Sequence, residues 1–112
     1  MQQITLADVI GGLKKELAQM LREGKSRNIS HSLLLPGKGH RLNFVVEENK
    51  SVAGRMILSV TVTPPDKSHI TTRYLCRGSL GEIADYMEKT PETAWAELTE
   101  ELVRGCSSFY YP

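Results

Sequence analysis

The chain has 112 residues, of which 40% are hydrophobic and 24% are charged, and its formal net charge is +1. This length predicts a single domain spanning 1–112 with one hydrophobic core, and the composition argues against a disordered chain. No run approaches the roughly 18 consecutive apolar residues of a membrane helix, and the first residues lack the pattern of a signal peptide. We therefore expect a cytoplasmic protein that makes no contact with a membrane.

Residues 5–22 predict an amphipathic helix, because apolar side chains recur there at helical spacing. Thr5 is a suitable N-cap, Asp8 favours the positive start of a helix, and Gly24 predicts its end. The pair Gly11 and Gly12 costs about 1 kcal/mol per glycine relative to alanine. We expect a kink at this pair or the close approach of another backbone.

Four runs with alternating apolar residues predict strands at 28–35, 40–48, 55–63 and 68–77. The connections are of hairpin length, and the second and third runs are followed by the segments 49–54 and 64–67. This spacing predicts an antiparallel meander. Alternation assigns these side chains to its apolar face: Leu42, Phe44, Val46, Met56, Leu58, Val60, Val62, Ile70, Tyr74 and Cys76.

The last third of the chain predicts two helices. Ser79 and Glu82 have the spacing of a capping box at the start of a short helix. Thr90 followed by Pro91 predicts the N-cap and first residue of a second helix, which Gly105 would end. The expected fold is therefore a single α+β domain with the order α-β-β-β-β-α-α, in which three helices pack mainly on one face of a four-stranded antiparallel sheet.

The segment PGKG at 36–39 resembles a phosphate-binding loop in composition but not in context. Such a loop needs Ser or Thr after its lysine and a helix behind it, whose N–H groups face the phosphates. Here a strand pattern follows instead. We predict a hairpin turn, whose tip Lys38, His40 and Arg41 would make positive.

Catalytic and metal-binding patterns are weak. His31, His40 and His69 fall on separate runs without metal-ligand spacing, and His31 is expected to be partly buried and hydrogen-bonded. The two cysteines, Cys76 and Cys106, are too few for a disulfide framework. A nucleophilic Cys–His pair stays open, but no pattern favours it. We predict no enzyme, no metal ion and no cofactor, and keep an enzyme with an unrecognised site as the third hypothesis.

The second face of the expected sheet collects polar and basic residues. One interpretation is a solvated sheet face, which antiparallel sheets commonly have. The other is a platform whose arginines bind phosphates or the carboxylates of a partner. Base stacking is not expected, because Phe44 and Tyr74 are assigned to the apolar side. The candidate anion- or partner-binding residues are Lys38, Arg41, Asn43, Arg55, Arg73 and Arg77.

Charge is divided unevenly along the chain. Residues 1–77 hold 12 Lys/Arg against 6 Asp/Glu, and residues 78–112 hold 2 against 7. Such blocks are typical of a solvated basic surface and a solvated acidic helix pair, and they also suit a partner of opposite charge. The aromatic residues Phe109, Tyr110 and Tyr111 either dock on the domain or offer a surface for a homodimer.

The segments LSVTVTPPDK and RGSLGEIADYM are loosely similar to parts of small accessory proteins of bacterial plasmids or phages, and no diagnostic motif accompanies them. We predict a small, non-enzymatic interaction protein of the regulator or inhibitor type. Its partner would be another protein, bound through the basic sheet face or the acidic helices. The second hypothesis is a nucleic-acid-binding protein that uses the basic sheet face.

Overall fold

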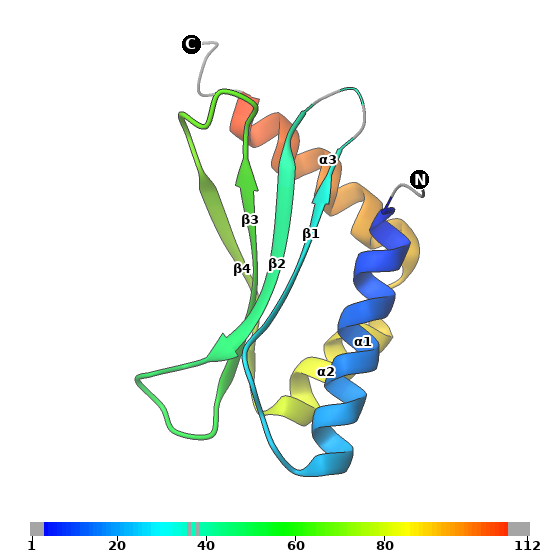
Figure 1. Ribbon diagram of the computed structural model, residues 1–112, viewed down its shortest axis with the longest axis vertical. Helices are drawn as coiled ribbons and strands as arrows, with labels where there is room; N and C mark the ends of the chain where they lie inside the picture. Colours follow the sequence, from blue (N-terminus) through cyan, green and yellow to red (C-terminus); the bar gives the residue numbers. More distant parts are fainter. Residues whose placement is uncertain (1–3, 36, 38, 108–112) are drawn as a thin grey trace.

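The computed structural model describes residues 4–35, 37 and 39–107, without the side chains of Cys106 and Ser107. The strands form one antiparallel sheet in which each strand pairs with the next one along the chain, and the helices pack against one of its faces (Figure 1). The predicted α+β class, element order and meander are confirmed. The elements are α1 (Leu6–Glu23), β1 (Ile29–Leu34), β2 (Arg41–Glu48), β3 (Met56–Thr63), β4 (Thr71–Gly78), α2 (Leu80–Lys89) and α3 (Glu92–Ser107).

The hydrophobic core fills the space between the sheet and the helices. Leu42, Phe44 and Val46 of β2 are fully buried, as the alternation predicted. The ring of Trp95 on α3 meets Phe44 edge to face, with 6.0 Å between ring centroids. Such a pair contributes about 0.5–1.5 kcal/mol beyond the burial of its apolar area. No helix among the described residues is long and apolar enough to cross a membrane.

Helix α1 begins and ends where the sequence predicts. The side-chain oxygen of Thr5 accepts from the backbone N–H of Asp8, and the carboxylate of Asp8 accepts from the N–H of Thr5. This capping box satisfies two N–H groups that the first turn leaves unpaired. At the other end Gly24 adopts the left-handed conformation, with φ of 69°, which glycine reaches without the steric penalty of a side chain.

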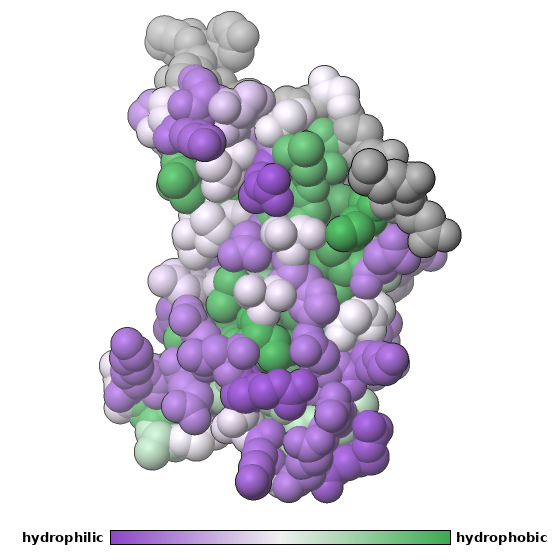
Figure 2. Space-filling view, viewed as in Figure 1, coloured by the Kyte–Doolittle hydropathy of each residue, from purple (hydrophilic) through white to green (hydrophobic). Residues whose placement is uncertain are grey.

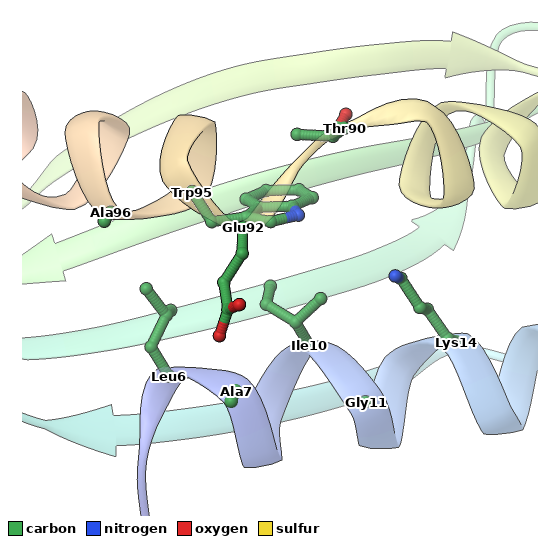
Figure 3. A pocket seen from close by; sticks show the side chains of 9 residues that line it. All are labelled: Leu6, Ala7, Ile10, Gly11, Lys14, Thr90, Glu92, Trp95 and Ala96. Carbon is green, nitrogen blue, oxygen red and sulfur yellow. The ribbon is translucent and has the colours of Figure 1, made fainter.

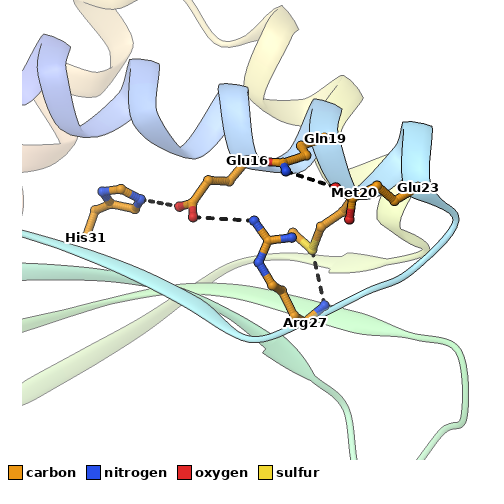
Figure 4. Close-up of polar contacts among 6 residues, drawn as sticks. All are labelled: Glu16, Gln19, Met20, Glu23, Arg27 and His31. Carbon is orange, nitrogen blue, oxygen red and sulfur yellow. Dashed lines mark hydrogen bonds and ion pairs between the residues drawn. The ribbon is translucent and has the colours of Figure 1, made fainter.

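A polar cluster joins α1 to β1 and the segment before it (Figure 4). The carboxylate of Glu16 is hydrogen-bonded to His31 and forms an ion pair with Arg27 at 3.6 Å. His31 is partly buried, as expected. A Cβ atom at Gly12 would lie 3.1 Å from Cε1 of His31, so the glycine leaves room for this ring. The close approach predicted at the glycine pair thus involves a side chain rather than a backbone.

The corner between α2 and α3 differs from the prediction. Ser79 and Glu82 form the expected capping box. Thr90, however, is the C-cap of α2 rather than the N-cap of α3, and its hydroxyl donates to the carbonyl of Tyr86 at 2.6 Å. Gly105 lies inside α3 and does not end it. A glycine inside a helix only weakens it, so the residue alone could not fix the boundary.

An irregularity in the β3–β4 pairing changes which side chains of β4 face outward. Leu58 pairs with Cys76, but the next residue, Ser59, pairs with Tyr74, so one residue of β4 is left over. An extra residue shifts the alternation, and every side chain beyond it moves to the opposite face. The prediction was therefore wrong for Arg73, which was assigned to the outer face, and for Tyr74, which was assigned to the apolar face. It was also wrong for Ile70, which precedes β4 and is 60% exposed.

We expect the two adjacent glycines of α1 to respond differently to alanine. At Gly11 an added Cβ meets nothing within 4 Å, whereas at Gly12 it meets His31. Gly11→Ala should raise the free energy of unfolding by about 1 kcal/mol through helix propensity. Gly12→Ala should gain less than half of that, because the His31 ring must move. Urea denaturation of both variants measures this difference, and equal gains would contradict the role assigned to Gly12.

Candidate interaction surface

The face of the sheet away from the helices is a mixed polar and apolar surface built in rows across the strands. Residues paired across antiparallel strands point to the same side, so the strand register defines each row. Figure 2 shows apolar patches between polar side chains in the view of Figure 1. The rows are Glu47–Ile57–Arg77, Ser30–Val45–Ser59–Tyr74, Ser32–Asn43–Thr61–Thr72 and Leu34–Arg41–Thr63. We call these fourteen residues the open face.

Tyr74 and Arg77 form the most prominent feature of the open face. Tyr74 is 57% exposed, and the guanidinium carbon of Arg77 lies 5.2 Å from the centroid of its ring. That distance allows a cation–π interaction, which is worth about 0.5–1 kcal/mol at an exposed site. The pair presents an apolar ring and a cation side by side. The sequence-based prediction missed it, because the bulge that turns Tyr74 outward has no signal in the local residue pattern.

Arg41 and Asn43 lie on the open face as predicted. Arg41 is exposed and stands between Leu34 and Thr63 in its row, while Asn43 is half-buried between Ser32 and Thr61. In the row of Asn43, the hydroxyls of Thr61 and Thr72 are 3.1 Å apart. The centre of the open face is therefore lined by short polar side chains.

Two of the predicted arginines are not on the open face. Arg55 precedes β3 and forms an ion pair at 3.1 Å with Glu82, in the capping box of α2. Arg73 shares a row with the buried Val60, and so points to the helix side, where it lies 3.6 Å from Glu101 of α3. Both arginines therefore connect the sheet to the acidic helices instead of forming part of an anion-binding platform.

The basic character of the open face is consequently weaker than predicted. Among its residues the charged ones are Arg41, Arg77 and Glu47. Lys38 lies outside the described residues, and so do the aromatic candidates for a homodimer, Phe109, Tyr110 and Tyr111. The predicted set is thus reduced to three described residues that share one surface, Arg41, Asn43 and Arg77, to which the structure adds Tyr74.

The chemistry of Cys76 does not favour a nucleophile. Burial raises the pKa of the Cys76 thiol, and the nearby Glu82 carboxylate raises it further. A raised pKa lowers the fraction of thiolate, which is the reactive form. Within the described ranges no three His, Cys, Asp or Glu side chains gather closely enough to hold a metal ion.

Comparison with protein-family models found no match, and comparisons with curated proteins and with solved structures found no significant similarity.

The Glu82 carboxylate gives a pH-dependent test of the link between α2 and the sheet. Hydrogen bonds from Ser79 and the charge of Arg55 hold the pKa of Glu82 below its usual value. A lowered folded-state pKa adds stability above the unfolded pKa, and this stability is lost as pH falls through the folded pKa. We expect Glu82→Gln to be less stable than the wild type at about pH 7 and to lose this difference as the pH falls below the ordinary glutamate pKa of about 4.3.

Urea denaturation at several pH values measures this effect. Glu88→Gln is the matched control, since Glu88 is an exposed glutamate on the same helix. A deficit of Glu82→Gln that stays constant over the whole pH range would show that the carboxylate charge contributes nothing to the capping box.

Proposed function

We propose that this protein is a non-enzymatic regulator or inhibitor that binds a partner protein through its open face, centred on Tyr74 and Arg77. The observation that supports the proposal most directly is the exposed Tyr74 ring beside the Arg77 guanidinium. Tyrosine and arginine are enriched among the few residues that dominate binding energy in protein interfaces. A partner would place an apolar group against the ring and a carboxylate against the guanidinium.

The rest of the open face suits a protein partner better than a polyanion. Leu34 is 52% exposed, and Val45 and Ile57 are half-buried on the same face, so apolar area extends over several strands. Glu47 shares a row with Arg77, and the Glu47 carboxylate would repel a phosphate backbone at this position. Protein interfaces combine apolar, aromatic and polar side chains in this way.

Nucleic acid is the second candidate, and Tyr74 is the observation that favours it. A base can stack on an exposed aromatic ring, and Arg41 and Arg77 could contact phosphates. Against it, Arg55 and Arg73 pair with Glu82 and Glu101. Fluorescence anisotropy with short DNA and RNA at low salt separates the candidates, because binding that is lost in Arg41→Ala and Arg77→Ala would replace the protein hypothesis.

Site-specific photo-crosslinking tests the proposed surface in cells that make the protein. Leu34 on the open face and Leu21 on α1 are matched positions, since both are exposed leucines at 52% and 47%. With a photoreactive phenylalanine analogue at position 34, we expect one discrete protein adduct, because a partner that covers the open face also covers Leu34. The same analogue at position 21 should give no such adduct.

A second substitution connects the adduct to the proposed centre. Arg77→Ser should reduce the adduct at position 34 about tenfold, which corresponds to about 1.4 kcal/mol. Arg104→Ser is the control, since it removes an exposed arginine on α3. Equal adducts at positions 34 and 21, or an adduct insensitive to Arg77→Ser, would rule out the open face as the binding surface.

A further inference from the structure

A groove lies between α1 and the first turns of α3, away from the open face (Figure 3). It has a volume of about 360 Å³, within the range of sites for small ligands. Leu6, Ala7 and Ile10 form the α1 wall, and Trp95 and Ala96 form the α3 wall. Gly11 also lines it, and a Cβ added there meets nothing within 4 Å. The groove therefore has apolar walls and free space along the helix.

Trp95 leaves a donor unused beside this groove. Its side chain is 2% exposed, and its indole N–H is buried without a hydrogen-bond acceptor among the described residues. An unpaired buried donor of this kind is costly, and native structures contain few of them. In Figure 3 the indole nitrogen faces the end of the groove where Thr90 and Lys14 lie. A ligand that offers an acceptor at this end would satisfy the N–H.

The polar groups are distributed unequally along the groove. Lys14 makes no ion pair with any described residue, so its ammonium can bind an anion at the Trp95 end. The hydroxyl of Thr90 already donates to Tyr86. The carboxylate of Glu92 points towards Leu6 and Ala7 at the other end (Figure 3). The hydrogen-bond donors of Trp95 and Lys14 therefore lie at one end of the groove. The exposed carboxylate of Glu92 lies towards the other end, where it would repel a second negative charge on a ligand.

We propose that the groove binds a small monocarboxylate with an apolar body. Its carboxylate would accept from the indole N–H of Trp95 and from the ammonium of Lys14, which is a charge-assisted hydrogen bond. Its apolar body would lie on Ile10 and in the free space beside Gly11. This site is independent of the open face, because it lies on the helix side of the sheet and shares no residue with Tyr74 and Arg77.

The single tryptophan of the chain makes the test direct. In a ¹H–¹⁵N spectrum of the full chain the indole N–H of Trp95 gives one resonance, which moves when the group gains an acceptor. We expect octanoate to shift this resonance in a saturable titration. Octanol, which has the same apolar body without the charge, should bind about tenfold more weakly, corresponding to about 1.4 kcal/mol.

Matched variants locate the site. Lys14→Met should weaken octanoate binding about tenfold, and Lys15→Met, which changes the adjacent exposed lysine outside the groove, should leave it unchanged. Gly11→Leu should abolish binding by filling the groove, and its backbone resonances confirm that it folds. No shift with octanoate, equal affinity for octanol, or equal effects of Lys14→Met and Lys15→Met would overturn the proposal.

Discussion

The alternation of side chains along the strands, interrupted once in β4, determines what each face of this sheet presents. Up to the pairing of Leu58 with Cys76, the row assignment follows the simple alternation. Beyond the extra residue, Tyr74 turns outward and Arg73 turns towards the helices. The same change creates the Tyr74–Arg77 pair and allows Arg73 to reach Glu101 of α3. One bulge therefore places an aromatic ring on the open face and removes an arginine from it.

The core lies between the open face and the groove and fixes the position of Trp95. Phe44 of β2 belongs to the layer of side chains under the open face, and Trp95 meets it edge to face. Trp95 also meets Tyr86 of α2 in the same geometry, with 6.1 Å between ring centroids. These contacts hold the indole at the wall of the groove, so the N–H keeps its direction. The sheet thus separates the open face from the groove, and the contacts of Trp95 with Phe44 and Tyr86 fix the wall of the groove.

The sequence predicts what depends on local patterns. The capping boxes of Thr5 with Asp8 and of Ser79 with Glu82 each join residues three positions apart, so the sequence predicts these helix starts. The apolar alternation of β2 and β3 is regular, so it predicts their buried side chains. The composition of the open face could not be predicted from local patterns alone. Leu75 and Cys76 are neighbours in the chain, yet both pack against the core, which simple alternation does not predict. The partners of Arg55 and Arg73 lie more than 25 residues away in the chain, and such a separation leaves no local signal.

The two adjacent glycines of α1 both destabilise the helix, but the structure explains only one of them. Gly12 has a structural explanation, because the His31 ring occupies the space that its side chain would need. Gly11 has none: it is exposed and open, and alanine would suit a helix better. The unpaired N–H of Trp95 is a second unfavourable feature without a structural explanation. Both lie at the same groove. A ligand that fills the space beside Gly11 and accepts from Trp95 accounts for both, whereas packing of the domain accounts for neither.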